Sequence, residues 1–333
     1  MTGIEWTDAI WNPIVGCSVV SAGCTNCYAM RMAHRLEAIG VAHYAGTTQQ
    51  SKAEPVWSGA VRQAPERTLT APLRLRRPKR VFVNSMGDLF HTAIPDAWID
   101  DVFAVMALAP HHTFQVLTKR PERMRKYMSE GPQVRIADAA LSVGRNLPDG
   151  HIGWQSHRWK PSPIKGCIQP AEWPLPNVWL GTSVEDQATA DERIPYLLDT
   201  PAAIRFVSAE PLLGPVDLDC IWDKAPDRDT SKIDALAGER YQHRGLGPMI
   251  RSGFTASLDW VIVGGESGPG ARPCDLRWWI RQIVNHCGQA GVPVFVKQLG
   301  GHVVEDGKRL TLKSRKGADL SEWPEDLRVR QWP

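Results

Sequence analysis

Three of the seven cysteines, Cys17, Cys24 and Cys27, lie within eleven residues of one another in the segment GCSVVSAGCTNC. Three thiolates can hold three irons of a [4Fe–4S] cluster and leave the fourth iron open to a dissociable ligand. The alternative is a structural zinc site, in which a histidine such as His34 supplies the fourth ligand. The residues alone favour the cluster, because the segment precedes a long series of strands and helices instead of forming a small independent knuckle.

The elements that must position this segment recur in a regular pattern. Continuous apolar runs, each followed by polar or glycine-rich residues and then a helical pattern, are typical of parallel strands buried on both faces. These runs begin at Val81, Thr113, Asn177, Ile204, Asp259 and Val292, and an earlier strand is expected around Trp11 to Val15. The alternation predicts an α/β fold, either a partial or full parallel (β/α) barrel or an open parallel sheet.

Two segments interrupt this pattern, at about residues 128–176 and 217–257. The first is rich in Gly, Pro, His and Trp, and the second is charged and weakly patterned. Long segments of this kind inside a domain are typically functional or disordered. We therefore expect one domain over 1–333, with two insertions and a C-terminal extension at about 300–333 that packs as a cap.

Polar side chains follow the ends of several expected strands, where a β/α barrel gathers them around one mouth. A single such charge would be read as an ion pair that ties loops together. Five strand ends favour a binding site, because a desolvated charge needs a strong local reason. The residues are Asn84, Ser85, Asp88, Thr118, Lys119, Arg120, Ser183, Glu185, Ser208, Glu210, Lys297 and Gln298.

The chain also resembles a known family, through IEWTDAIWNPIVGC, FVNSMGDLFH, FQVLTKRPERM, SVEDQATADERIPYLL, RFVSAEPLLGP, WVIVGGESGPGARP and VFVKQLG. These phrases are similar to the phage-associated three-cysteine-motif family of unknown function. The cysteine segment resembles a longer-spaced radical S-adenosylmethionine (SAM) signature, in which the third cysteine is likewise followed by an aromatic residue, here Tyr28. The family is regarded as distantly related to radical SAM enzymes, with spore photoproduct lyase as the nearest suggested functional relative.

The resemblance implies a barrel of the radical SAM type. Cys17, Cys24 and Cys27 would ligate a [4Fe–4S] cluster that binds SAM and cleaves it to a 5′-deoxyadenosyl radical. It further implies cofactor contacts from Asn84, Ser85, Asp88, Lys119, Ser183, Glu185, Glu210 and Glu266. The Gly-Gly-Glu sequence that handles the SAM amino group in the superfamily is absent after the second strand. The same sequence occurs after the sixth strand, as Gly264, Gly265 and Glu266. Because its position differs, the role of binding the SAM amino group is not transferred to it.

Two further residues are candidates for catalysis. Cys274 follows the glycine-rich loop after the sixth strand, and we hypothesise that it donates a hydrogen atom or an electron during turnover. Lys297 ends the last strand and is the second candidate. A radical SAM enzyme would also need an electron donor such as flavodoxin or ferredoxin.

The net charge of +3 is unevenly distributed, because LRLRRPKR concentrates five basic residues that can neutralise phosphates. They are Arg74, Arg76, Arg77, Lys79 and Arg80. With fourteen tryptophans available for stacking, this stretch favours a radical SAM enzyme that repairs a nucleic-acid lesion or modifies a base. The alternatives are a non-catalytic nucleic-acid-binding protein stabilised by zinc or a cluster, and a radical SAM enzyme that acts on a small molecule or peptide.

The composition also bears on the compartment. No apolar stretch approaches the roughly 20 residues of a membrane span, and MTGIEWTDAIWNP has neither region of a secretory signal. We therefore expect a cytoplasmic protein without a membrane partner, in which clustered cysteines bind metal more often than they form disulfides.

Overall fold

The computed structural model describes residues 4–51, 54–145, 147, 151–224, 230–243 and 248–333. The chain divides into two compact units. The first comprises Met1–Val20, Cys27–Leu180 and Thr200–Ala203, and the second comprises Ser21–Asn26, Gly181–Asp199 and Ile204–Pro333. Cys17 and Cys27 therefore belong to the first unit, and Cys24 belongs to the second. Parts of both expected insertions (146, 148–150, 225–229 and 244–247) lie outside the described residues.

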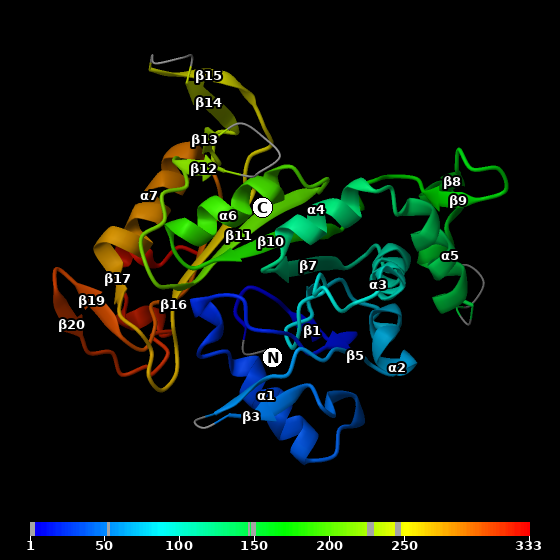
Figure 1. Cartoon of the computed structure of the whole chain (residues 1–333), viewed down its shortest axis with the longest axis horizontal. Coiled ribbons are helices and arrows are strands. Elements are labelled where there is room, and N and C mark those ends of the chain that lie inside the picture. The colour runs from blue at the N-terminus through cyan, green and yellow to red at the C-terminus, as the bar shows by residue number, and fades with distance from the viewer. Residues whose placement is uncertain (1–3, 52–53, 146, 148–150, 225–229, 244–247) are drawn as a thin grey trace. The chain divides into compact units, whose positions relative to one another are not determined.

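Parallel strands form the centre of the first unit. Here β1, β6, β7 and the first residues of β10 are neighbours in that order (Figure 1), and β6 is parallel to both β1 and β7. Val83, Phe114 and Val116 are completely buried, as expected for strands covered on both faces. The bounds are Ala9–Trp11 for β1, Arg80–Val83 for β6, Thr113–Thr118 for β7 and Val178–Val184 for β10.

Helices join these strands and cover them. Helix α3 connects β6 to β7 and is apolar on nearly all sides, so every residue from Val102 to Leu108 is buried. The helices are α1 (Tyr28–Ala38), α2 (Glu66–Leu69), α3 (Asp96–Leu108), α4 (Pro121–Ser129) and α5 (Gln133–Val143). Three short antiparallel pairs complete the unit: β2 (Ile14–Val15) with β5 (Arg62–Gln63), β3 (Thr48–Gln50) with β4 (Pro55–Trp57), and β8 (Trp159–Pro161) with β9 (Ile168–Pro170).

The second unit repeats the parallel arrangement. The end of β10, then β11 (Ile204–Leu212), β16 (Trp260–Gly265) and β18 (Val294–Gln298) are neighbours in that order, and β16 is parallel to both β11 and β18. Gly181 lies within β10 because a Cβ there would approach the Phe206 ring to 2.6 Å. Helices α6 (Gln187–Leu198) and α7 (Arg281–Ala290) complete the α/β pattern. Asp186 caps the first of them by accepting the Thr189 N–H.

The second expected insertion contains an antiparallel sheet that the weak sequence pattern did not predict. Its order is β12 (Ile221–Asp223), β13 (Ser231–Asp234), β14 (Glu239–His243) and β15 (Met249–Phe254). The side chain of Asp223 is fully buried and accepts a hydrogen bond from Arg240 at 2.8 Å. The alternation of apolar and polar residues is weak in this segment, because much of β15 is exposed or half-buried.

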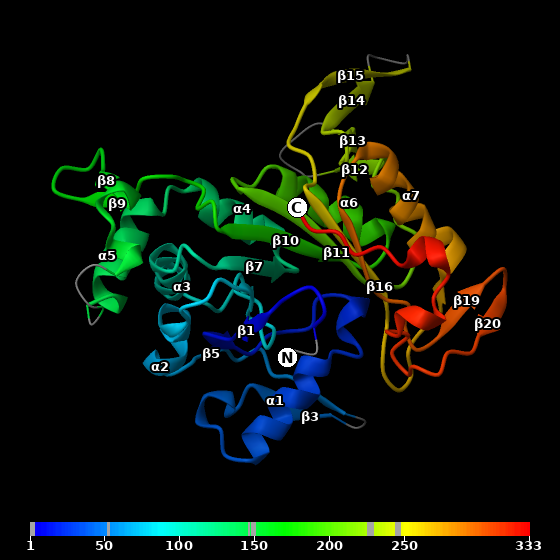
Figure 2. The ribbon, with the colours of Figure 1, turned by 180° about the vertical axis from the view of Figure 1, so that it is seen from behind.

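The C-terminal segment folds back onto β18. The Val296 N–H donates to Val329 O at 2.9 Å, and the Gln331 N–H donates to Val294 O at 3.0 Å; Figure 2 shows this segment in red. Before it, β17 (Cys274–Asp275), β19 (Val303–Glu305) and β20 (Lys308–Leu310) form a small sheet. Within the part of the chain that is described, no helix has the length and apolar character needed to cross a bilayer. The prediction of a mixed α/β fold with parallel central strands is confirmed.

Candidate functional site

Cys17 and Cys27 lie on the same apolar cluster of the first unit. Cys17 follows β2 and the glycine Gly16, and Cys27 is the residue that precedes the first turn of α1. Both side chains pack against a cluster that includes Val15, Ala33 and Met86. No disulfide joins any of the seven cysteines. Cys17 and Cys27 therefore face one apolar surface of the first unit.

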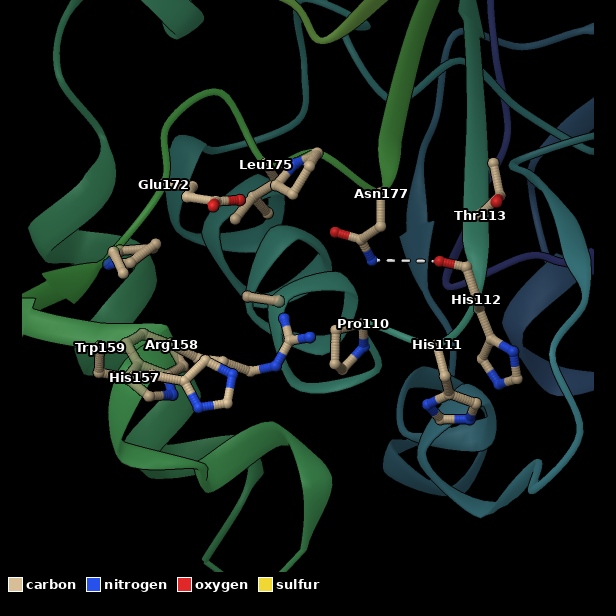
Figure 3. Close-up of a pocket in the computed structure, with 14 residues that line it drawn as sticks. Pro110, His111, His112, Thr113, His157, Arg158, Trp159, Glu172, Leu175 and Asn177 are labelled. Atoms are coloured by element: carbon tan, nitrogen blue, oxygen red, sulfur yellow. Dashed lines mark hydrogen bonds between the residues drawn. The ribbon is translucent and has the colours of Figure 1, made fainter. Parts of the chain in front are cut away.

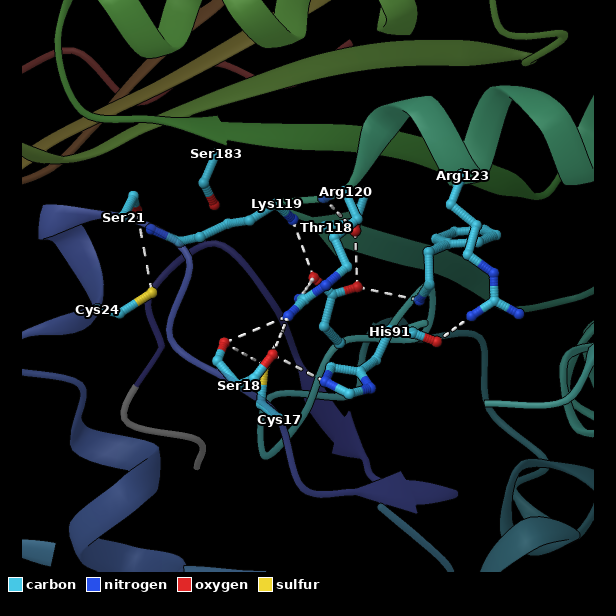
Figure 4. Close-up of polar contacts among 12 residues, drawn as sticks. Cys17, Ser18, Ser21, Cys24, His91, Thr118, Lys119, Arg120, Arg123 and Ser183 are labelled. Atoms are coloured by element: carbon cyan, nitrogen blue, oxygen red, sulfur yellow. Dashed lines mark hydrogen bonds and ion pairs between the residues drawn. The ribbon is translucent and has the colours of Figure 1, made fainter. Parts of the chain in front are cut away.

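Arg120 and Asp88 control the electrostatics around Cys17, and Figure 4 shows Arg120 and Cys17. The Arg120 guanidinium donates to Cys17 Sγ at 3.7 Å and to Asp88 Oδ2 at 2.8 Å. Burial, followed by the charge of Asp88, raises the pKa of Cys17 to about 12, and Arg120 opposes this shift. The thiol is therefore protonated in the metal-free protein at neutral pH. An arginine N–H beside a sulfur would stabilise the thiolate once a metal takes the place of the proton.

Ser18 and His91 extend this network, as Figure 4 also shows. Arg120 Nη2 donates to Ser18 Oγ at 2.7 Å, and Ser18 Oγ lies 2.9 Å from His91 Nε2. His91 Nδ1 accepts the Ala93 N–H at 3.2 Å, so in the neutral ring Nε2 carries the proton and donates to Ser18. Burial lowers the pKa of His91. Its ring therefore holds the cysteine loop as a neutral donor.

Gly16 cannot be replaced without displacing this loop. Its φ is +95°, and a Cβ would lie 2.1 Å from Ala60 O. We expect Gly16→Ala to lower the free energy of unfolding by about 2–5 kcal/mol, from the left-handed conformation plus the clash. Urea unfolding measures this. Gly40→Ala is the matched control, because Gly40 has a φ of +83° but open space around it, and it should cost only about 1–2 kcal/mol. Equal losses at the two positions would contradict the clash.

Asn84 and Ser85 contact the chain before the first cysteine. Asn84 has a φ of +58°, and its buried Oδ1 accepts the Ile14 N–H at 3.3 Å. Its Nδ2 is a buried donor without a partner among the described residues. Ser85 Oγ donates to Asn12 Oδ1 at 3.1 Å. Both residues thus support the segment that leads to Cys17, and the amide of Asn84 retains an unused donor.

Cys24 lies in a short 3₁₀ turn of the second unit, Ala22–Cys24, and its exposed fraction is 8%. Ser21 Oγ is 3.9 Å from Cys24 Sγ and donates to Glu185 Oε1 at 2.9 Å; Figure 4 shows the contact between Ser21 and Cys24. Glu185 also explains the glycine before this cysteine, since a Cβ at Gly23 would lie 2.5 Å from its carboxylate. The turn is therefore packed directly against Glu185.

The two predicted glutamates around this turn are both held by arginines. Glu185 and Arg193 are 1% and 2% exposed in their side chains and lie 3.1 Å apart, and Arg193 also donates to Ser183 O at 2.8 Å. Glu266 accepts two hydrogen bonds of 2.9 Å from the Nε and backbone N–H of Arg272. Burial opposes ionisation of Glu266, but the bonds from Arg272 outweigh it and lower the pKa.

Arg272 connects Glu266 to the turn that carries Cys24. Its Nη1 donates to Ala22 O at 3.0 Å, so carboxylates at the ends of β10 and β16 both reach the turn, one through Ser21 and one through Arg272. Glu185 and Glu266 therefore position the Cys24 turn, whereas Ser183 contacts Arg193 through its carbonyl oxygen. Their predicted contact with a cofactor stays a prediction.

Three other predicted residues of the second unit are either paired or buried. Lys297 Nζ lies 2.6 Å from Glu210 Oε1, and this pair retains partial exposure. Cys274 is completely buried, and burial raises the pKa of its thiol to about 12. A Cβ on Gly265 would lie 3.1 Å from the Cys274 Cβ, so this cysteine is closely packed. Its proposed role in hydrogen-atom transfer stays a prediction.

The basic run, Arg74 to Arg80, lies at the end of the strands opposite to Cys17. Arg74 bonds to Thr70 Oγ1 at 2.9 Å, and Arg80 pairs with Asp8 at 3.0 Å, whereas Arg76 and Arg77 are exposed. The run precedes β6, and Asp88 follows it. The five steps between the six residues of β7 alone span about 16 Å at about 3.3 Å each. The basic residues and Cys17 therefore lie at opposite ends of the strands of the first unit.

His112 contacts the chain just before this run and makes stability depend on pH. It is buried, and its Nε2 lies 3.2 Å from Pro72 O; burial, and then His111, lower its pKa below 6.5. Between the folded and unfolded pKa values the unfolded chain binds more protons, so the free energy of unfolding falls as the pH drops below about 6.5.

We expect His112→Gln to reduce the difference in unfolding free energy between about pH 7.5 and about pH 5.5. The control variant His157→Gln, at an exposed ring, should leave it unchanged; an equal effect of both variants would contradict the assignment.

A second group of possible metal ligands was not predicted from the sequence. Asp217, Asp219 and His286 place one ligand atom each within 4.8 Å of one another. His286 Nδ1 is 3.2 Å from Asp219 Oδ2 and 3.8 Å from Asp217 Oδ1. Among the described residues, this is the group in which three or more His, Cys, Asp or Glu side chains bring their ligand atoms this close together. The Asp-x-Asp spacing is the only local signal, because His286 is distant in sequence.

The comparisons with known proteins identify a family but no activity. The family model described as a protein of unknown function (DUF5131) matches residues 1–325. The chain belongs to this family. No curated protein and no solved structure matches the chain. Membership in the family therefore covers nearly the whole sequence, and the function must be argued from the residues themselves.

Proposed function

We propose that this protein is a radical SAM enzyme whose [4Fe–4S] cluster is ligated by Cys17, Cys24 and Cys27. The observation that carries the proposal is the C-x6-C-x2-C spacing, which supplies three thiols in one short loop. The N–H of Arg120 directed at Cys17 Sγ adds support, because hydrogen bonds to sulfur tune such clusters. We extend the proposal to a barrel of the radical SAM type, in which active-site residues follow the carboxyl ends of strands.

The residues around Cys17 fit the proposed cluster. When bound, such a cluster would supply one electron to cleave SAM. Asp88 would orient Arg120, which would offset the negative charge of a thiolate at Cys17. Val15 and Met86 would exclude water from one side, and Ser18 and His91 would hold the loop in place. Asn84 Nδ2 is a donor with no described partner, which suits a ligand that carries oxygen.

Anaerobic reconstitution with iron and sulfide tests the proposal. We expect about four irons per chain and, after addition of SAM and a reductant, formation of 5′-deoxyadenosine, which chromatography detects. Colourless protein that keeps one zinc would overturn the proposal and support a non-catalytic, zinc-stabilised protein.

We further propose that the substrate is a nucleic acid, in which the enzyme repairs a lesion or modifies a base. The exposed side chains of Arg76 and Arg77 support this choice, because exposed arginines neutralise phosphates. Binding of a labelled DNA or RNA that weakens steeply with salt is expected. Binding that does not depend on salt would favour a small molecule or peptide as substrate.

A further inference from the structure

The first unit contains a cavity of about 440 Å³ whose lining contains no cysteine among the described residues (Figure 3). Its volume falls within the range of small-molecule sites. Three segments form its lining: the turn between α3 and β7, the chain at 157–159 that leads into β8, and the chain at 170–177 that follows β9. The last two belong to the expected insertion at 128–176, so the insertion makes a hollow against the parallel strands.

The lining combines a flat ring with hydrogen-bonding groups. The indole N–H of Trp159 already donates to Gly153 O at 2.8 Å. Its ring packs against Trp154 with the ring centroids 5.5 Å apart, so stacking is left to the part of the ring that lines the cavity. Asn177 Nδ2 donates to Met106 O at 3.0 Å and to His112 O at 3.2 Å. Figure 3 shows the Asn177 oxygen directed away from the latter contact, while Arg158 extends toward Pro110. A planar heterocycle with N–H donors suits such a lining.

The basic run borders this cavity. His111, a lining residue, places its Nε2 2.7 Å from Leu75 O. Thr113, another lining residue, donates its N–H to Lys79 O at 2.9 Å. The exposed residues Arg76 and Arg77 lie between these two attachment points. The exposed arginines and the lining of the cavity therefore lie next to each other.

We propose that this cavity binds one unpaired base of a nucleic acid, stacked on Trp159, while Arg76 and Arg77 bind the neighbouring phosphates. A base held in a duplex could not enter, so the site selects single strands or flipped nucleotides. The site lies at the amino ends of β6 and β7, whereas Asp88 and Arg120 follow their carboxyl ends. It therefore anchors the nucleic acid at the end of these strands away from Cys17. The inference rests on the nucleic-acid part of the proposed function and is independent of its radical chemistry.

Fluorescence anisotropy of the full-length protein with a labelled single-stranded probe of about 12 nucleotides, long enough to cover one site, tests this directly. DNA, RNA and duplex probes form parallel arms, without SAM or reductant. We expect single strands to bind more tightly than the duplex. Trp159→Ala should weaken binding about tenfold, and Trp159→Phe, which keeps a stacking ring, should retain most of it. Trp278→Ala, at an exposed tryptophan of the second unit, is the matched control and should bind as the parent does.

The double variant R76A/R77A provides an independent readout that does not alter the cavity. The slope of log affinity against log salt should fall by about 1.4, about 0.7 for each lost phosphate contact on a single strand. Unchanged affinity of a folded Trp159→Ala, an unchanged slope in R76A/R77A, or tighter binding of the duplex would each overturn the inference. Failure to bind iron would leave these measurements intact, so the two proposals fail separately.

Discussion

Replacement of Cys17, Cys24 or Cys27 by alanine is expected to reduce bound iron from about four per chain to near zero and to abolish 5′-deoxyadenosine formation. Each thiolate holds one iron of the proposed cluster, so two remaining thiolates leave two irons without a protein ligand. Iron analysis and electron paramagnetic resonance of the reduced protein measure the first effect. Chromatography of the reaction mixture measures the second.

Cys167→Ala is the matched control for these variants. Cys167 is a partly exposed free cysteine of the first unit, next to β9. We expect this variant to bind as much iron as the parent and to form 5′-deoxyadenosine at the same rate. If one of the three loop variants kept its full iron content, the proposed ligand set would be wrong.

Asp88→Ala is expected to produce the largest loss of stability. Asp88 is 5% exposed and accepts hydrogen bonds from Thr118 Oγ1 at 2.6 Å, from the Lys119 N–H at 3.0 Å and from Arg120 at 2.8 Å. Its removal leaves the charge of Arg120 without its carboxylate. It also takes the acceptor from three other donors, namely the Thr118 hydroxyl and the N–H groups of Lys119 and Phe90. Loss of one partner from a buried ion pair costs about 3–5 kcal/mol. Urea unfolding of the metal-free protein measures this loss.

Asp96→Ala is the control for this variant. Asp96 pairs with Arg123 at 3.1 Å, but its side chain is 47% exposed, and exposed pairs contribute about 0–1 kcal/mol. We also expect Asp88→Ala to bind iron less tightly, because Arg120 loses one of the two residues that hold it at Cys17 and keeps only Ser18. A loss from Asp88→Ala no larger than that from Asp96→Ala would show that the network around Asp88 contributes little.

The sequence predicted the elements whose signals are local. Apolar runs such as the one at Val81 marked buried parallel strands, because burial on both faces requires continuous apolar residues. Asp275 and Gly291 are residue types that favour the two ends of a helix, and the structure places them there. Asp275 accepts the Trp278 N–H, and Gly291 has a φ of +71° beyond the end of α7. The cysteine spacing is equally local, so the residue types and their separation are enough to propose a ligand set.

The tertiary structure alone decided what surrounds those residues. Arg272 reaches Ala22 across 250 positions of sequence, and His286 meets Asp217 and Asp219 only because α7 packs beside them. Folding also buried Cys274, paired Glu185 with Arg193, and put Arg76 at the end of the strands away from Cys17. A pattern of neighbouring residues specifies backbone conformation and burial. Which distant side chains meet depends on how the elements pack, and no local pattern encodes that packing.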